Sequence, residues 1–382
     1  MMSLRILIAS TLGLLATGVT AQLPTSGIYA AAPDAWLLGS GREWHFRTAV
    51  SDMPRKLVFR DPTAAESQVV EKAKLLFQKS SAKSMALFQG TDVVWLGYKE
   101  PATADTRFLS LSVGKTVTSM AIGKSICGRK MAFDSLVGKM LPELAETDLG
   151  KATVGDLLKM SSGTWEGNPD STIVTSRQDE QIVEGRQSFF DLLRTAKVST
   201  AHEDPSGAKR KPGQEFAYRS TDPLALGVLI NMATGMHYAE WVEQQVLLPA
   251  GIARPAVIGQ DRYGFGQADG NVRMYLEDWI RFAVWVKESE AGRGCFADYL
   301  HEATRTQVAN RTKRFGKLFD GYGYLIWTEN RYLRDSYWAV GHGGQRIGWN
   351  HGNNRMLVAF SNAEDYMDDL YRLYREWASL SD

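Results

Sequence analysis

Cysteine is scarce in this sequence. Only Cys127 and Cys295 occur among the 382 residues, which is too few for a zinc-binding cysteine cluster or a Cys-x-x-Cys redox pair. The residues therefore give no support for a catalytic metal, and we expect no metal and no cofactor. Two cysteines can form one disulfide in an oxidising compartment or remain two separate buried thiols, and the sequence leaves both open.

An excess of charge of one sign is also missing. The 44 Lys and Arg residues nearly balance the 43 Asp and Glu residues, so the formal net charge is +1. No basic stretch alternates with aromatic residues in the way that would follow a phosphate backbone. We therefore expect no nucleic-acid partner, and the oligomeric state stays open.

Apolar runs long enough to span a bilayer, which takes roughly 20 residues, are absent as well. The apolar run 6–16 follows Arg5 and precedes the small residues Val19-Thr20-Ala21, which is typical of a secretory signal peptide. We predict a signal peptide at 1–21, cleaved before Gln22, and an exported protein, periplasmic or secreted, with no stable membrane span after its removal. An uncleaved membrane anchor is the alternative.

Hydrophobic patterns predict a sheet that is built from both ends of the chain. Thr63 and Glu66 form a capping box at the start of a predicted helix, 63–80. The apolar stretches 85–88 and 93–98, joined by a polar turn, predict a β-hairpin. Helical spacing recurs over 111–126, 154–160, 224–232, 238–247 and 276–286. Late strands are predicted at 322–328, 337–341 and 356–361, and a closing amphipathic helix at 367–377.

These elements predict an α/β (α+β) fold in which helices flank one antiparallel sheet. We expect the sheet subdomain to comprise 61–130 and 316–382. A mostly helical subdomain is expected between them, at 131–315. The N-terminal extension at 22–60 has no clear pattern.

Ser112 and Lys115 carry the first chemical signal. An alcohol is a weak nucleophile at neutral pH and needs a neighbouring base. Residues at i and i+3 share one face of a helix, and burial can lower the pKa of a lysine until it accepts a serine proton. The Ser-x-x-Lys matches at Ser80 and Ser206 lie at a polar helix end and in a loop. Only the match at Ser112 opens a buried helix, and a capping serine with a solvated lysine is its alternative.

Tyr218 provides the second signal, after a turn at Pro212-Gly213. It is the only tyrosine that has Ser or Asn two residues further on, here Ser220. A phenol beside a cationic lysine ionises more easily and can relay a proton from the nucleophile to the leaving group. The alternative is a core tyrosine with a hydrogen-bonded hydroxyl.

His342-Gly343-Gly344-Gln345 is the third signal, at the end of an apolar strand. Two glycines allow a substrate to lie against the strand edge. The backbone N–H of Gln345 is then a candidate partner for that of Ser112 in an oxyanion hole. A simple turn or bulge is the alternative.

The segments 107–116, 212–220 and 341–344 together resemble the three motifs of the serine β-lactamase-related superfamily. This superfamily includes class C β-lactamases, penicillin-binding proteins, related esterases and 6-aminohexanoate-oligomer hydrolases. The resemblance extends from about residue 65 to 380, and it implies a β-lactamase/transpeptidase-like fold.

The resemblance also implies a mechanism. Ser112 is expected to form an acyl-enzyme, Lys115 and Tyr218 to manage its proton, and water then to release the acid. His342 stands where class C β-lactamases have the lysine of Lys-Thr-Gly. Ser220 replaces their asparagine, and its shorter side chain cannot both donate and accept as an amide does.

Two further positions bear on the substrate. The loop 161–168, which contains Trp165, resembles the mouth loop of the oligomer hydrolases. Those enzymes use a further tyrosine there, whereas this chain has none between Tyr98 and Tyr218. Arg346 is a candidate to receive a substrate carboxylate, with a solvated surface arginine as the alternative.

The sequence therefore predicts a serine hydrolase that acts on a small ester, amide or lactam through an acyl-enzyme. Cleavage of an ester or of some other amide is favoured over nylon-oligomer cleavage. A β-lactamase and a D-Ala-D-Ala carboxypeptidase are the alternatives among enzymes. A catalytically silent relative that binds peptidoglycan fragments or a protein partner is the alternative from another class.

Overall fold

The computed structural model describes most of the chain after residue 44. The described residues are 45–165, 181–182, 184–194, 197–198, 211–311 and 318–381. The predicted signal peptide at 1–21 and the first part of the predicted extension, 22–44, lie outside them. Among the described residues, no helix has both the length and the apolar character needed to cross a membrane.

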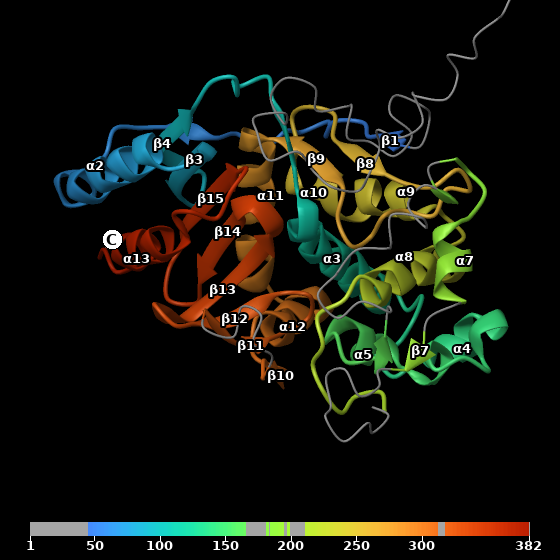
Figure 1. Cartoon of the computed structure of the whole chain (residues 1–382). Helices are drawn as coiled ribbons and strands as arrows, with labels where there is room; N and C mark the ends of the chain where they lie inside the picture. The colour runs from blue at the N-terminus through green and yellow to red at the C-terminus, as the bar shows by residue number, and fades with distance from the viewer. Residues whose placement is uncertain are drawn as a thin grey trace, which may run out of the picture.

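A large sheet, built from both ends of the chain, organises the molecule (Figure 1). Within the described residues it has nine strands, in the order β10-β11-β12-β13-β14-β15-β3-β4-β2. All neighbours are antiparallel except β2 and β4. The strands are β2 (Val58–Phe59), β3 (Ala82–Gln89), β4 (Asp92–Tyr98), β10 (Val308–Ala309), β11 (Phe319–Tyr322), β12 (Trp327–Asn330), β13 (Leu333–Gly341), β14 (Gln345–Asn350) and β15 (Arg355–Ser361).

Helices cover this sheet and fill the second half of the molecule, as the predicted fold class requires (Figure 1). They include α2 (Ala64–Lys79), α3 (Gly114–Cys127), α4 (Val137–Met140), α5 (Val154–Leu158), α7 (Phe189–Leu193), α8 (Thr221–Thr234), α9 (Tyr238–Val242), α10 (Leu248–Ala250), α11 (Leu276–Glu290), α12 (Cys295–Ala303) and α13 (Met367–Ala378). Strand β15 is buried along its whole length because α11 and α13 both pack against it. Helix α3 packs against α8, α12 and the sheet strand β13, so it lies at the centre of the molecule.

The predicted N-terminal cap of α2 is confirmed, and it also joins the helix to the sheet. Thr63 donates its backbone N–H to Glu66 Oε2 at 2.8 Å, and Thr63 Oγ1 accepts from the backbone N–H of Glu66. The buried Glu66 carboxylate also accepts from Arg355 Nη1 of β15 at 2.8 Å. The hydrogen bond from Arg60 and the one from Arg355 hold the pKa of Glu66 well below its ordinary range despite burial. Glu66 therefore both caps helix α2 and links it to strand β15 of the large sheet.

A second, small sheet was not predicted. It pairs β1 (His45–Arg47), β8 (Val257–Gly259), β9 (Val272–Tyr275) and β5 (Arg107–Leu109) in that order. Two of these strands lie within 131–315, which we expected to be mostly helical. Strands of three or four residues are too short to show an alternating pattern, so the sequence does not reveal them.

Two late strands also differ from the prediction. The predicted strand 322–328 is the end of β11 and the start of β12, joined by a tight turn. Strand β14 was missed because its residues, Gln345–Asn350, are mostly polar or glycine yet all buried. A strand buried on both faces carries no alternation of polar and apolar residues.

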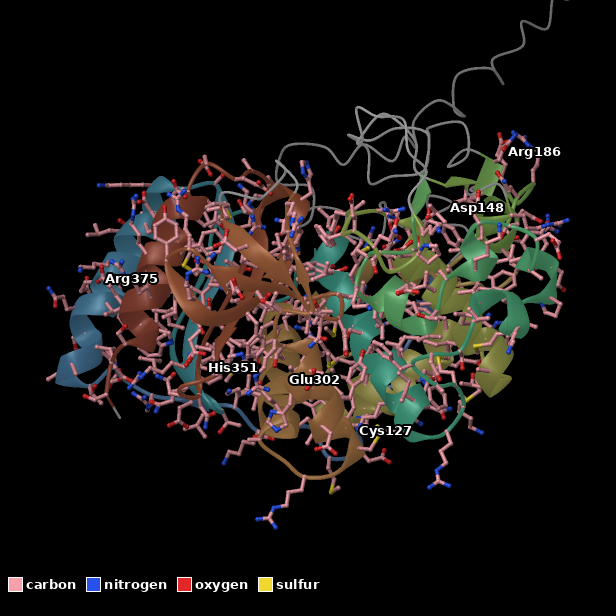
Figure 2. The ribbon with its side chains drawn as sticks, turned by 90° about the horizontal axis from the view of Figure 1, so that it is seen from below. Cys127, Asp148, Arg186, Glu302, His351 and Arg375 are labelled. Carbon is pink, nitrogen blue, oxygen red and sulfur yellow. A yellow bond between two sulfur atoms is a disulfide. The ribbon has the colours of Figure 1, made fainter. Side chains whose placement is uncertain are left out.

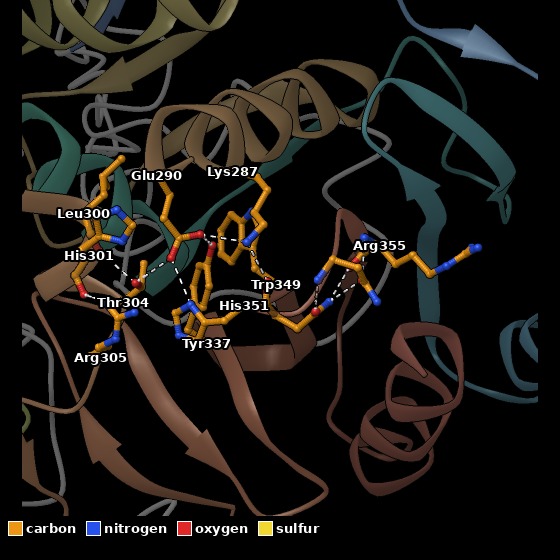
Figure 3. A network of polar contacts seen from close by, with 12 residues as sticks. Lys287, Glu290, Leu300, His301, Thr304, Arg305, Tyr337, Trp349, His351 and Arg355 are labelled. Atoms are coloured by element: carbon orange, nitrogen blue, oxygen red, sulfur yellow. Dashed lines mark hydrogen bonds and ion pairs between the residues drawn. The ribbon is translucent and has the colours of Figure 1, made fainter. Parts of the chain in front are cut away.

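A buried polar cluster ties the end of α11 to the large sheet (Figure 3). Glu290 accepts hydrogen bonds from Lys287 Nζ at 2.9 Å, from Tyr337 OH at 2.7 Å and from Thr304 Oγ1 at 2.9 Å. His351 Nδ1 lies 3.0 Å from the same carboxylate. Burial alone raises the pKa of Glu290, but the contacts with His351 and Lys287 outweigh it and lower the pKa to about 2.

We predict that Glu290→Gln destabilises the protein in a pH-dependent way. The folded-state pKa is depressed, so the carboxylate stabilises the fold above about pH 5 and this contribution is lost as pH falls towards 2. A lowering of this size corresponds to about 3 kcal/mol in the free energy of unfolding at pH 7. Urea denaturation at pH 7 and pH 3 measures the difference between wild type and variant, which should shrink at pH 3.

Glu288→Gln is the matched control for this prediction. Its side chain, on the same helix, is 54% exposed and pairs with Arg55. Exposed pairs contribute at most about 1 kcal/mol, so this variant should stay near wild type. A Glu290→Gln deficit that is equally large at both pH values would contradict the prediction.

The two cysteines are joined, which resolves one of the alternatives left open by the sequence. The Cys127–Cys295 disulfide links the C-terminal end of α3 to the first residue of α12, and the two Cα atoms are 5.7 Å apart. Figure 2 labels Cys127 near the periphery of the molecule. The bond therefore fixes the far end of the central helix to its neighbour.

We predict that removing this bond with Cys127→Ser and Cys295→Ser together lowers the free energy of unfolding by about 2–5 kcal/mol, because the bridge closes a long loop in the unfolded chain. Urea denaturation followed by circular dichroism measures the loss. Wild type in reductant should match the double variant, and reductant should leave the double variant unchanged. Two titratable thiols in denatured, unreduced wild type would contradict the disulfide.

Candidate active site

The turn that presents Ser112 is fixed by the small sheet. Strand β5 ends at Leu109, and Ser110 then bonds to Val272 of β9 twice, through Ser110 N to Val272 O at 2.8 Å and Val272 N to Ser110 Oγ at 3.0 Å. Leu111 follows with φ of +44°, a left-handed conformation that is strained for a residue with a side chain. The chain thereby turns sharply, and Ser112 lies half-buried in the short 3₁₀ turn Leu111–Val113 that leads into α3.

Lys115 lies on the same face as Ser112, as the spacing predicts. Its Nζ donates to Ser112 Oγ at 3.1 Å and to the backbone carbonyl of Asp269 at 2.7 Å. The side chain is buried, so the alternative of a solvated lysine does not fit the structure. The Asp269 carbonyl comes from the loop before β9, and no side-chain pattern could have revealed a backbone acceptor.

Tyr218 reaches the same place from a distant segment. The backbone N–H of the preceding residue, Ala217, donates to Met160 O at 2.9 Å and so fixes the segment. Lys115 Nζ lies 5.2 Å from the centroid of the Tyr218 ring. The Ser112 hydroxyl and the Tyr218 ring, both singled out from the sequence, therefore lie beside the Lys115 amine.

Two aromatic residues that the sequence did not single out hold the Tyr218 ring. Trp327 stacks on it with centroids 5.3 Å apart, and Tyr322 meets it edge-on at 6.2 Å. Burial raises the pKa of Tyr322 well above its ordinary range, and the nearby Tyr218 raises it further, so Tyr322 stays neutral. Both residues lie in the aromatic run predicted as a strand, which was the available signal.

Ser220 and its neighbours form a buried polar group at the start of α8. Ser220 is buried, and its hydroxyl has no hydrogen-bond partner among the residues that the structure describes. Arg219 Nη1 donates to Thr164 Oγ1 at 3.2 Å. Ser162 bonds through its hydroxyl to both Thr164 and Asp222. These bonds fasten the loop that begins at residue 161 to the segment that carries Tyr218.

Trp165 is the last described residue of the predicted mouth loop. It ends β6 (Thr164–Trp165), which pairs with β7 (Lys197–Val198). The loop residues 166–168 lie outside the described residues. The expected role of Trp165 in substrate binding therefore stays a prediction.

The third motif forms a tight turn, here called the HGG turn and comprising residues 341–345. It connects β13 to β14, and Gly341 pairs with Gln345 across it. Gly343 and Gly344 have φ of +71° and +95°, which favour glycine. A Cβ atom on Gly341 would lie 2.7 Å from the carbonyl oxygen of Ser110. The turn thus packs directly against the segment that presents the candidate nucleophile.

The side chains within the HGG turn differ in exposure. His342 is exposed, whereas Gln345 is buried. Gln345 Nε2 donates to the carbonyls of His342 and Ser361, at 2.8 and 2.9 Å, and its Oε1 accepts from the Ser361 N–H at 3.0 Å. The amide side chain is thus committed to holding the turn, and only the backbone of Gln345 is a candidate for contact with a substrate.

Arg346 differs from both sequence-based expectations. It is fully buried rather than solvated. Its guanidinium bonds to the carbonyls of Gly341 and Gln345 and to the hydroxyl of Tyr371. These partners place it behind the HGG turn, with the charge turned inward, so the structure does not support a contact with a substrate carboxylate. Burial was not visible in the sequence because polar residues dominate this strand.

In the part of the chain that the structure describes, no three His, Cys, Asp or Glu side chains cluster in a way that could hold a metal ion. The chemistry available at this site is that of a serine hydroxyl beside a buried amine and a phenol.

Comparison with known proteins connects this site to a family. A family model described as Beta-lactamase matches residues 76–380. A curated relative, the 6-aminohexanoate-dimer hydrolase of Paenarthrobacter ureafaciens, is 23% identical over 259 residues, which is 65% of this chain and 65% of the relative. The match therefore spans slightly less than two thirds of that relative's own length.

Solved structures share the fold at low sequence identity. A Bacillus anthracis protein assigned as a 6-aminohexanoate-dimer hydrolase matches with a TM-score of 0.71 at 16% identity, over 94% of this chain and 95% of that one. A penicillin-binding protein from Bacillus halodurans matches with a TM-score of 0.60 at 18% identity, over 80% of this chain and 98% of that one.

Proposed function

This chain belongs to the beta-lactamase family, and we propose on that premise that it is a serine hydrolase that forms an acyl-enzyme on Ser112. One observation carries the proposal: Lys115 Nζ lies 3.1 Å from Ser112 Oγ and 5.2 Å from the centroid of the Tyr218 ring. A nucleophile within hydrogen-bonding distance of a base, with a third group beside that base, is the arrangement that covalent hydrolysis requires.

In the proposed first step, Ser112 Oγ attacks the substrate carbonyl carbon while its proton passes to the amine of Lys115, and Tyr218 relays it towards the leaving group. The backbone N–H groups of Ser112 and Gln345 stabilise the oxyanion. The bond to the leaving group then breaks, and the proton passes to the departing oxygen or nitrogen. In the second step water attacks the ester on Ser112, loses a proton to the same groups and releases the acid.

A linear ester or amide is the substrate class we favour, ahead of a lactam. Ser220 and His342 replace the asparagine and lysine that the resemblance to class C β-lactamases implies. Arg346, the candidate beside the HGG turn to bind a substrate carboxylate, is buried with its charge turned inward. The curated relative is named as a 6-aminohexanoate-dimer hydrolase and not as a β-lactamase, which supports this order.

We also propose that the protein is exported. The Cys127–Cys295 disulfide supports this location, because such bonds persist in oxidising compartments and are rare in the cytosol.

The first test of this function is covalent labelling with a fluorophosphonate probe. Wild type should be labelled and should hydrolyse p-nitrophenyl acetate, whereas Ser112→Ala should lose both because the attacking oxygen is gone. Comparing p-nitrophenyl acetate, nitrocefin and a D-Ala-D-Ala peptide ranks the substrate classes, and the first should be turned over best. An unlabelled, inactive wild type would favour a binding role instead.

A second test concerns Lys115. We expect Lys115→Met, which keeps the apolar stem but removes the amine, to slow probe labelling and ester hydrolysis by about a hundredfold to ten-thousandfold. The matched control is Lys124→Met on the same helix, where the ammonium lies 3.8 Å from the centroid of Phe296, a ring outside the site. Stopped-flow measurement of acylation compares the variants. Equal rates for the two variants would contradict the role of Lys115.

A further inference from the structure

Arg346 is a buried charged residue that the proposed reaction steps do not use. Its side chain is fully shielded from solvent. Burying a guanidinium costs free energy unless its N–H donors are paired. Once they are paired, the group is held in one geometry. The partners of Arg346 therefore indicate what its burial achieves.

One end of the guanidinium holds the HGG turn. Arg346 Nη1 donates to the carbonyl oxygens of Gly341 at 2.7 Å and of Gln345 at 2.9 Å. These two carbonyls stand immediately before and after the bend, so a single nitrogen bridges both arms of the turn. A planar guanidinium can do this while its Nε bonds elsewhere.

The other end is anchored outside the turn. Arg346 Nε donates to the hydroxyl of Tyr371 on α13 at 2.7 Å, and Nη2 lies 3.5 Å from Glu364 Oε1. The turn is thereby connected through Arg346 to the C-terminal helix, rather than held only by its own backbone.

Gln345 is held on two further sides. Its side-chain amide bonds to the carbonyls of His342 and Ser361 and accepts from the Ser361 N–H. Its own carbonyl is held by Arg346. With side chain and carbonyl both held, the Cα atom of Gln345 and the direction of its bond to the backbone nitrogen are restricted as well.

That direction matters because the turn touches the nucleophile segment. Gly341 approaches Ser110 so closely that a Cβ atom would lie 2.7 Å from its carbonyl oxygen, and Ser112 is two residues further on. Oxyanion stabilisation depends on donors that are already aimed at the developing charge. A shift of about 1 Å in such a group can cost about a hundredfold in rate.

We propose that Arg346 is a positioning residue for the oxyanion hole: by clamping the carbonyls of Gly341 and Gln345 it holds the Gln345 N–H in place without touching the substrate. This inference rests on the proposed function and adds a residue outside its reacting groups.

The test compares Arg346→Lys with Tyr371→Phe. A lysine keeps the charge, but its side chain is one bond shorter than the path to Nη1 and cannot donate to both carbonyls at these distances, so kcat for p-nitrophenyl acetate should fall by about a hundredfold with little change in KM. Tyr371→Phe removes one partner of the same guanidinium but leaves the contacts to the turn. It should lower the thermal stability and leave kcat close to that of wild type.

Phenylboronic acid provides a readout that a loss of stability alone would not move. The serine oxygen adds to boron while its proton passes to the site base, giving a tetrahedral anion that resembles the transition state. The inhibition constant should rise in Arg346→Lys in parallel with the loss of kcat/KM, and it should stay unchanged in Tyr371→Phe. Thermal denaturation shows separately that each variant is folded under the assay conditions.

The outcomes separate this inference from the function on which it rests. A folded Arg346→Lys with wild-type kcat and boronate affinity would overturn the positioning role and leave the hydrolase intact. A wild type that neither turns over the ester nor binds the boronate would overturn both. If Arg346→Lys does not fold, Arg346→Gln, which buries no charge, is put through the same comparison and should show the same losses.

Discussion

The buried amine of Lys115 is the group around which this molecule is arranged. A polar group in the interior is tolerated only with hydrogen-bond partners, and here these are the hydroxyl of Ser112 and the carbonyl of Asp269. One acceptor comes from the 3₁₀ turn that leads into α3, the other from the loop that leads into β9. Helix α3 with the turn before it and the loop that leads into β9 must therefore both be in place before the amine is hydrogen-bonded.

Backbone contacts between distant segments bring the motifs to that arrangement. Ser110 joins the nucleophile turn to β9, and Gly341 brings the HGG turn against the same segment. On the other side, Ala217 bonds to Met160 and delivers Tyr218 to the site. Each motif is thus held by a different element, and the site forms only where the large sheet, the small sheet and the helical part converge.

The features that could be predicted from the sequence are those with a local pattern. The capping box of Thr63 and Glu66, the first hairpin and the spacing of Ser112 and Lys115 each follow from residues a few positions apart. The small sheet, strand β14 and the inward turn of Arg346 depend on partners more than a hundred positions away or on burial of polar residues, and neither leaves a periodic trace. Trp327 illustrates the limit of sequence-based prediction. The segment that contains it was predicted as a strand, but its stacking on Tyr218 was not predicted.

The most direct measurement of the central claim is the site of acylation during turnover. Wild type is mixed with an excess of p-nitrophenyl ester and quenched in acid within milliseconds. The protein is then digested, and its peptides are analysed by mass spectrometry. An acyl group on the hydroxyl of Ser112, present at early times and lost when substrate is exhausted, is the predicted result. Continued hydrolysis with the acyl group on another residue, or on none, would contradict the claim.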